Sequence, residues 1–362
     1  MAGSGLRPAA TLPGMDPDFL RRLPKVVLHD HLDGGLRPAT ILELARQQGY
    51  DGLPADEVEA LRRWFFQGES ATLERYLEAF RQTLAVMQTA DALARVAEEA
   101  VLDLAADGAV YAELRFAPLL HLQRGLTPEQ VVDAVLAGCA AGGQRAGIPA
   151  AIIVCAMRQA DDAAVVAALA GRFAGRGVVA FDLVGPEAGF LASRHRAACR
   201  AAAAGGLHLT IHAGEGAGVE SVADALGCGA ERLGHGVRLV EDLTVREGRA
   251  VGLGPIAAQV HARGIVLEVC PTSNLHTGAF PTAVSHPVGV LYRAGFAVTL
   301  NPDNRLMSAT SMTAEFALVV EHHGFTLDDL RTVTLRGAEG AFCDSGTRAE
   351  VRERVLAGYP TA

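Results

Sequence analysis

The stretch that decides the fold runs from Leu207 to Glu215 and reads LHLTIHAGE. Its apolar residues alternate with polar ones up to His212, which is typical of a strand, and Glu215 follows three residues later, past a glycine. In a barrel of parallel strands the reactive groups lie where strands end and loops begin. We therefore expect His212 at a strand tip and Glu215 on the turn above it. One such histidine is more often structural, and it is the repetition of the pattern that gives it weight.

Apolar runs with polar tips recur along the chain. We expect strands at residues 25–31, 109–116, 150–156, 178–183, 207–212, 232–236, 265–270 and 297–301. Segments with helical spacing lie at 40–48 (with Thr40 as its cap), 56–66, 72–106, 128–146, 161–174, 192–204, 219–229, 255–263 and 286–294, and two or more helices follow residue 313. This alternation predicts an α/β fold, a single (β/α)8 TIM barrel, with extra helices between the first two strands and at the C-terminus.

The length and composition of the chain suit one large domain. Of its 362 residues 50% are hydrophobic and 20% are charged, enough for a substantial core. We find no internal repeat or linker that would mark a boundary. We therefore expect residues 1–24 to form an N-terminal extension and residues 25–362 to form the barrel domain.

Charge and cysteine content narrow the class of protein. A net charge of -9 without a dense basic tract argues against nucleic acid as a partner. The six cysteines include no C-x-x-C pair, which favours reduced thiols over disulfides or a structural zinc site. There is no signal-peptide core and no apolar run of about 18 residues, so we expect a cytoplasmic protein without a membrane partner.

Four residues at the expected strand tips could hold a metal ion. His29 and His31 end the first strand and lie on one side of it, because side chains alternate along a strand. His212 ends the fifth strand and Asp303 follows the eighth. Taken singly, Asp303 in Pro-Asp-Asn is more often an ordinary turn residue. Three imidazoles and one carboxylate together suit Zn²⁺ or a similar divalent ion.

Glu215 and His235 remain at the strand tips without a role as ligands. A carboxyl and an imidazole beside a metal site can supply the acid and the base that hydrolysis requires.

Other polar and aromatic features have more ordinary interpretations. Glu113 and Arg115 alternate along the second strand, and buried charges of this kind are more often structural than catalytic. Trp64-Phe65-Phe66 is either part of the core or a lid above the pocket. Gly185, after the fourth strand, is either a plain turn glycine or a position where a backbone N–H approaches a ligand.

Seven segments of the chain resemble the motifs of the adenosine deaminase family, whose members are metal-dependent hydrolases with a (β/α)8 barrel. They are Leu28–Gly34 (LHDHLDG), Tyr111–Arg115 (YAELR), Phe181–Glu187 (FDLVGPE), Ile211–Glu215 (IHAGE), Leu233–Gly236 (LGHG), Val269–Asn274 (VCPTSN) and Leu300–Asp303 (LNPD). They occur in order over residues 25–340. The other zinc deaminases combine H-x-E with P-C-x-x-C, a pattern that Cys270-Pro271 does not fit.

The resemblance implies a role for each site residue. His29, His31, His212 and Asp303 hold one zinc ion. Glu215 protonates the purine nitrogen next to the attacked carbon, while His235, helped by Asp303, takes the proton of the attacking water. Gly185 offers its N–H to a ring nitrogen, Asp33 contacts the ribose 5′-hydroxyl, and His31 and position 304 also face the substrate.

The implied reaction is zinc-dependent hydrolytic deamination of adenosine and 2′-deoxyadenosine to the inosines and ammonia. Attack disrupts the aromatic ring, so protonation of the adjacent nitrogen lowers the barrier, and a dry pocket keeps such an acid protonated. Asp33 favours a nucleoside substrate, because adenine-specific relatives more often carry glutamate there.

One position departs from the family pattern. Asn304 stands where a second aspartate usually meets the five-membered ring of the purine, and Pro302 also differs. Asparagine can still donate and accept hydrogen bonds, but it carries no charge. Two alternatives therefore stay open: a deaminase of another 6-aminopurine (aminodeoxyfutalosine, adenine or a modified nucleoside), and a catalytically silent nucleoside-binding barrel.

Overall fold

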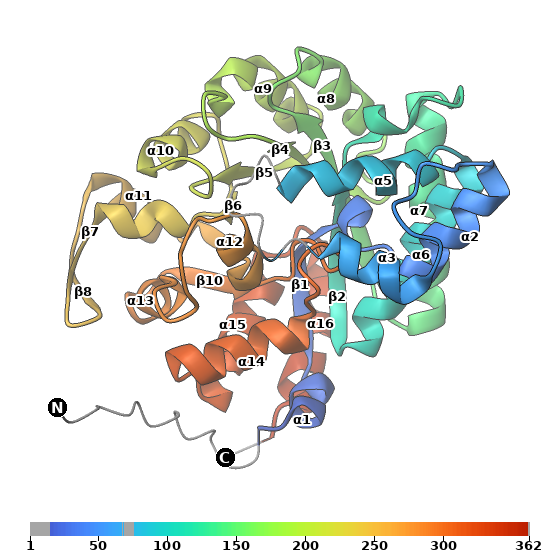
Figure 1. Cartoon of the computed structure of the whole chain (residues 1–362). Coiled ribbons are helices and arrows are strands. Elements are labelled where there is room, and N and C mark those ends of the chain that lie inside the picture. The colour runs from blue at the N-terminus through green and yellow to red at the C-terminus, as the bar shows by residue number, and fades with distance from the viewer. Residues whose placement is uncertain (1–14, 67, 69–75, 361–362) are drawn as a thin grey trace, which may run out of the picture.

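Eight parallel strands form the centre of the protein, whose computed structural model describes residues 15–66, 68 and 76–360 (Figure 1). The strands are β1 (Lys25–His31), β2 (Ala109–Phe116), β3 (Ala150–Met157), β4 (Val178–Val184), β5 (His208–Ala213), β6 (Arg232–His235), β9 (Val266–Val269) and β10 (Ala297–Leu300). Each pairs in parallel with the next strand in this order. The predicted barrel strands are therefore confirmed.

The barrel closes between β10 and β1 through one side chain and a short bridge. Asn301 accepts through Oδ1 the backbone N–H groups of Leu28 and His29, at 2.8 and 3.1 Å. Beyond it, Asp303 N–H donates to the carbonyl of His29, and His31 N–H donates to the carbonyl of Asp303. The closure therefore holds the backbone at His29, in β1, next to the backbone at Asp303, which follows β10.

Helices surround the strands and cover their outer faces (Figure 1). They are α7 (Pro128–Ala146), α8 (Ala163–Gly171), α9 (Arg196–Ala204), α10 (Val219–Gly227), α11 (Pro255–Arg263), α13 (Val288–Arg293), α14 (Met312–His323), α15 (Leu327–Gly340) and α16 (Ser345–Gly358). Short 3₁₀ turns lie at Leu32–Gly34, Pro118–His121, Ala192–His195 and Val237–Asp242. The large apolar core lies between this ring and the strands, and a small cluster around Ile153, Cys155 and Ala180 is separate from it.

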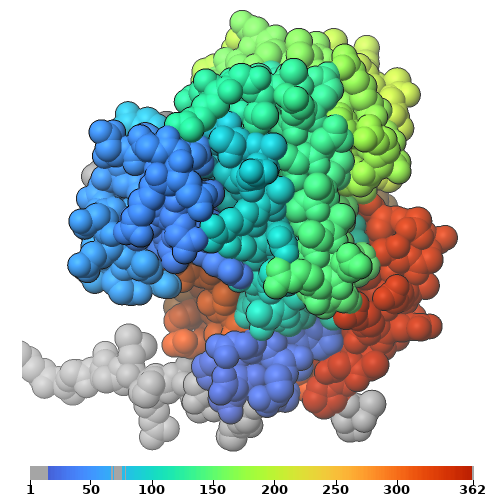
Figure 2. All heavy atoms as spheres, turned by 90° about the vertical axis from the view of Figure 1, so that its right-hand side faces the viewer, coloured from blue at the N-terminus to red at the C-terminus, as the bar shows by residue number. Residues whose placement is uncertain are grey.

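The excursion between β1 and β2 contains α2 (Pro38–Gln48), α3 (Val58–Phe65), a 3₁₀ turn (Leu77–Ala79), α5 (Phe80–Val86) and α6 (Ala90–Ala106). Figure 2 shows its first part, in blue, as a lobe beside the green helices of the barrel wall. Two predictions fail here. Thr40 is not a cap, because α2 begins two residues earlier at Pro38 and Thr40 donates to Glu99 instead. The expected helix 72–106 is interrupted before Thr89, which caps α6, and residues 72–75 lie outside the described residues.

Three elements were not predicted from the sequence. The hairpin of β7 (Leu243–Arg246) and β8 (Arg249–Leu253) projects from the barrel, and α12 (Pro271–His276) follows β9 directly. The helix α1 (Pro17–Arg22) lies within the segment expected as an extension, and it buries Leu20 in the core. Among the described residues, we find no helix with the length and apolarity needed to cross a membrane.

Candidate functional site

The carboxyl ends of the strands open onto a cavity of about 650 Å³. Its lining includes all but one of the site residues predicted from the sequence. They are His31, Asp33, Gly185, His212, Glu215, His235, Asp303 and Asn304. The remaining residue, His29, is fully buried and lies against the other imidazoles, with ring centroids 4.6 Å from His212 and 4.8 Å from His235.

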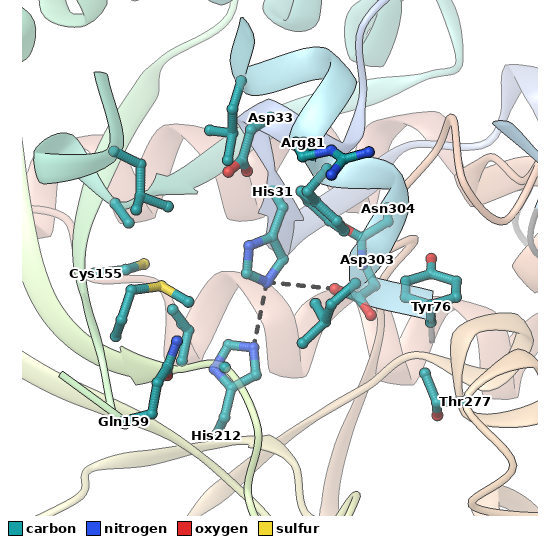
Figure 3. Close-up of a pocket in the computed structure, with 18 of the residues that line it drawn as sticks. His31, Asp33, Tyr76, Arg81, Cys155, Gln159, His212, Thr277, Asp303 and Asn304 are labelled. Carbon is teal, nitrogen blue, oxygen red and sulfur yellow. Dashed lines mark hydrogen bonds and ion pairs between the residues drawn. The ribbon is translucent and has the colours of Figure 1, made fainter. Parts of the chain in front are cut away.

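Three of the predicted metal ligands, His31, His212 and Asp303, direct their polar atoms toward one point (Figure 3). His31 Nε2 lies 3.2 Å from His212 Nε2 and 3.4 Å from Asp303 Oδ1. His29 Nε2 lies 3.3 Å from the same carboxylate oxygen. A tetrahedral zinc ion with ligands at about 2.1 Å separates neighbouring ligand atoms by roughly 3.4 Å. The separations therefore fit a single metal ion.

Two of these atoms form no hydrogen bond with the rest of the described protein. Among the described residues, His29 Nε2 and Asp303 Oδ1 have no hydrogen-bond partner, although both are buried. Burial lowers the pKa of His31 and of His212 well below the usual range, so both imidazoles are neutral and their lone pairs are free to bind a cation. Buried polar atoms without partners are costly, and a bound metal would satisfy them.

A second layer of groups orients the ligands from behind. His29 Nδ1 is 2.8 Å from Glu268 Oε2, and His212 Nδ1 is 3.0 Å from Asp182 Oδ2. The Ser273 hydroxyl donates to the other oxygen of Asp303 at 2.5 Å. Carboxylates that accept from the far nitrogen of an imidazole fix its tautomer, so Nε2 is left to face the metal.

Glu215 stands on a turn that is held by another carboxylate. Glu187 is buried and accepts four consecutive backbone N–H groups, from Gly214 to Ala217, at distances of 2.6 to 3.1 Å. The Glu215 side chain accepts a hydrogen bond from Thr277 at 3.0 Å, and its Oε2 lies 3.4 Å from His235 Nε2. The backbone of the turn and the Glu215 carboxyl that it carries are thus both held by hydrogen bonds.

Burial raises the pKa of two carboxyl groups that line the pocket, Glu215 and Asp33. It raises the pKa of Glu215 well above its usual range, and the charges of Asp303 and Glu187 raise it further. Burial also raises the pKa of Asp33 to about 7. A carboxyl that stays neutral near pH 7 can donate a hydrogen bond or a proton to a substrate.

The backbone is strained at two of the predicted residues. His235 and Asp303 have φ of 63° and 61°, in the left-handed region that side chains other than glycine rarely adopt. Such conformations cost free energy and persist where the surrounding structure imposes them, often at functional sites. Here they turn both side chains into the cavity.

Glycines permit close approaches around the ligand set and the pocket wall. A Cβ on Gly34 would lie 2.1 Å from Asn304 Oδ1, and one on Gly234 would lie 3.1 Å from both His29 and His212. Gly185 has φ of 97° and lines the cavity. Gly185 and Asn304 thus both lie at the cavity wall, and their contacts with a ligand stay predictions.

Sequence reasoning missed several residues that support the site. They are Asp182, Glu187, Glu268, Ser273, Asn274 and Thr277. For Asp182 and Glu268 a signal existed, because each is a single charge within a buried apolar strand. Ser273 and Asn274 lie in α12, a helix that was not expected, and Thr277 follows its last residue. Of the aromatic cluster, Phe65 belongs to the core, whereas Trp64 and Phe66 are exposed and the Phe66 ring packs against His276.

The fold and the site together define a class. A (β/α)8 barrel with three imidazoles and a carboxylate converging at its strand tips is an arrangement suited to metal-dependent hydrolysis. The chain belongs to the adenosine deaminase family, whose profile, described as adenosine deaminase, matches residues 24–358. It is therefore a hydrolase of that family, as the sequence predicted.

Named relatives agree with the assignment. The chain is 48% identical over 360 residues to adenosine deaminase 1 of Streptomyces coelicolor, covering 97% of this chain and 91% of the relative. It is 49% identical over 346 residues to the adenosine deaminase of Mycobacterium ulcerans, covering 94% and 96% of the two chains.

Solved structures share the fold. A zinc-bound amidohydrolase from Burkholderia ambifaria is 25% identical, with a TM-score of 0.84 over 99% of this chain and 95% of the other. The adenine deaminase of Arthrobacter aurescens, 24% identical, superposes with a TM-score of 0.82 over 93% and 98%. One protein of this fold thus binds zinc.

Proposed function

We propose that this protein removes the 6-amino group of adenosine and 2′-deoxyadenosine by hydrolysis, giving the inosines and ammonia. One observation carries the proposal. A carboxyl that burial keeps protonated, Glu215, faces the same cavity as the four converging ligands. Together with membership of the family, this supports attack by water on one side of the purine ring and proton delivery at its edge.

We assign one zinc ion to His29, His31, His212 and Asp303. Neutral imidazoles and a carboxylate are a ligand set that zinc accepts readily. When bound, zinc lowers the pKa of water and so supplies a nucleophile at neutral pH. The chain supplies the geometry, because Glu268, Asp182 and Ser273 hold three of the ligands from behind.

The remaining residues of the site manage protons and bind the substrate. Glu215 donates a proton to the ring nitrogen next to the attacked carbon, so that the ring accepts electrons as it loses aromaticity. The attacking water gives its proton to the pair of His235 and Asp303, both of which line the cavity.

Substrate binding falls to residues around the cavity wall. We assign the N–H of Gly185 to a ring nitrogen, Asp33 to the ribose hydroxyl, and His31 and Asn304 to the remaining edge of the purine. All four residues line the cavity. A small purine compound is the kind of partner that such a pocket accommodates, with a few polar groups set in a largely apolar wall.

The test is a turnover assay with the zinc-loaded protein. Conversion of adenosine to inosine lowers the ultraviolet absorbance, and a panel of other 6-aminopurines is assayed beside it. We expect rapid turnover of adenosine and 2′-deoxyadenosine. Zinc-loaded protein that binds nucleosides and turns over no member of the panel would overturn the proposal in favour of a binding protein.

Asn304 favours one second candidate. An uncharged side chain at the purine edge suits a substrate that differs in the five-membered ring, such as a modified nucleoside. If adenosine is turned over slowly and another member of the panel rapidly, the reaction is still hydrolytic deamination, but the preferred substrate is that other 6-aminopurine.

A further inference from the structure

A chain of hydrogen bonds runs outward from His235 into the protein. Asn274, on α12, has its amide nitrogen 3.0 Å from His235 Nδ1. Its amide oxygen lies 3.2 Å from His286 Nε2. His286 in turn accepts the backbone N–H of Val288 through Nδ1, at 3.2 Å. All of these side chains are buried, so water does not compete for the bonds.

The donor and the acceptor of each hydrogen bond in this series are fixed by its last member, the backbone N–H of Val288. A backbone amide can only donate, so His286 Nδ1 must carry a lone pair, and in the neutral ring the proton then lies on Nε2. Burial lowers the pKa of His286 to about 3, which excludes the doubly protonated ring at neutral pH. His286 Nε2–H therefore donates to the oxygen of Asn274.

This orientation of Asn274 determines the state of His235. The amide oxygen faces His286, so the NH2 group faces His235 and donates to Nδ1. Rotating the amide by half a turn would set its NH2 against the N–H of His286, leaving two buried donors face to face. Neutral His235 must then carry its proton on Nε2, the nitrogen that lies 3.4 Å from Glu215 and faces the cavity.

We propose that Asn274 and His286 are positioning residues that hold His235 as the Nε2–H tautomer, so that His235 acts as a hydrogen-bond donor at the reaction site. His235 then stabilises the negative charge that develops on the attacking oxygen, while the carboxylate of Asp303 takes the proton that the water loses. This reverses the direction implied by the family resemblance, in which His235 takes the proton of the attacking water. The inference rests on the proposed function for its consequence, but the tautomer itself is a property of the protein.

The tautomer is measured directly in the zinc-loaded full chain. Nitrogen-15 spectra of labelled histidine distinguish a ring nitrogen that carries a proton from one that carries a lone pair, and His235→Asn identifies the signals of residue 235. We expect the proton on Nε2 of His235. A lone pair on Nε2 with the proton on Nδ1 overturns the inference, whether or not the protein deaminates adenosine.

Two variants test the consequence. Asn274→Asp can only accept, so we expect it to move the proton of His235 to Nδ1 and to lower kcat at least about tenfold, with KM and zinc content little changed. His286→Gln can still donate to Asn274, so it should retain more of the wild-type kcat than His286→Leu. Undiminished kcat in both Asn274→Asp and His286→Leu would show that the tautomer does not matter.

A neighbouring imidazole provides the matched control. His323 packs against His286, with ring centroids 6.3 Å apart, but takes no part in the chain to Asn274. His323→Gln should leave both the His235 spectrum and kcat unchanged. If His323→Gln lowers kcat as much as His286→Leu does, the loss of kcat comes from packing around α13. The proposed role of the hydrogen bonds from His286 through Asn274 to His235 would then be overturned.

Discussion

The interior of the barrel and its mouth both bury many charged groups, but the two regions differ in how completely these groups are hydrogen-bonded. In the interior, Arg232 pairs with Glu113 and Glu268, and Arg115 pairs with Asp182 and Glu268, in each case at full or nearly full burial. Both oxygens of each of these carboxylates have a partner. At the mouth, by contrast, His29 Nε2 and Asp303 Oδ1 lie 3.3 Å from each other, and neither has a hydrogen-bond partner among the described residues.

The difference separates charges that maintain the structure from those that are available for chemistry. An interior network whose carboxylate oxygens are all paired costs desolvation but leaves no carboxylate oxygen to bind a cation. Unpaired atoms, strained backbone at His235 and Asp303, and a carboxyl kept neutral by burial occur together only at the strand tips in the part of the chain that the structure describes. Single-residue variants can therefore test whether a given charged side chain maintains the structure or takes part in the reaction.

The largest effect should come from Glu215→Gln. The amide preserves size and hydrogen bonding to Thr277 but cannot deliver a proton, so we expect kcat to fall by more than about 10²-fold. Zinc content, measured by elemental analysis, should be unchanged because Glu215 is not a ligand. Normal turnover in a zinc-replete Glu215→Gln protein would place this carboxyl with the structural charges.

Glu268 belongs to both regions, so Glu268→Gln should affect both. It accepts from His29 Nδ1 and pairs with both interior arginines. We expect zinc affinity to fall about 10- to 100-fold, because the ligand loses the carboxylate that orients it. Competition with a chelator of known affinity measures this loss.

Glu113→Gln is the matched control from the interior alone. It removes one charge from the Arg232 pair and should cost roughly 3 kcal/mol of stability, seen as a lower thermal midpoint, with zinc affinity unchanged. If Glu268→Gln and Glu113→Gln weaken zinc binding equally, the charges of the interior and those of the mouth do not have separate roles.

A smaller effect is expected from Glu187→Gln, which acts on the mouth through the turn. One amide oxygen cannot accept the four N–H groups that the carboxylate accepts, so kcat should fall about tenfold at an unchanged zinc content. The charge of Glu187 also raises the pKa of Glu215. Its removal should lower that pKa, so the loss of activity at alkaline pH should begin at a lower pH.

The control for this variant is Glu231→Gln, which alters a half-exposed carboxylate that pairs with His208 at the other end of β5. We expect the same kcat and the same pH profile as in the wild type. A pH profile of Glu187→Gln that matched the wild type would limit Glu187 to a structural role.

The sequence predicted the barrel and the site because both depend on local patterns. Each strand is an apolar run, and its reactive residue comes directly after it, as His212 and His235 do. The support of the site could not be predicted this way. Glu187 lies 28 residues from Glu215, and Asn274 lies 39 residues from His235, so only the folded barrel brings them together.

Helix boundaries failed for a related reason. Apolar spacing continues through residues 80–101, and the interruption at Thr89 comes from a cap that the periodicity does not register. The hairpin of β7 and β8 was missed because its two strands are short, with four and five residues, and are largely exposed.

The smallest effect should come from Asn304→Asp, at the edge of the mouth. Asn304 lines the cavity next to Asp303, and its Oδ1 is buried without a hydrogen-bond partner among the described residues. A carboxyl here changes one hydrogen bond to the substrate, so we expect the ratio of kcat/KM values between adenosine and the other 6-aminopurines to change about 2- to 10-fold. Zinc content should stay the same, because the ligand is Asp303.

Asp303→Asn is the matched variant and should lose zinc. If Asn304→Asp instead loses the metal while Asp303→Asn retains it, the ligand has been assigned to the wrong one of these neighbours, and the boundary between metal binding and substrate recognition moves by one residue.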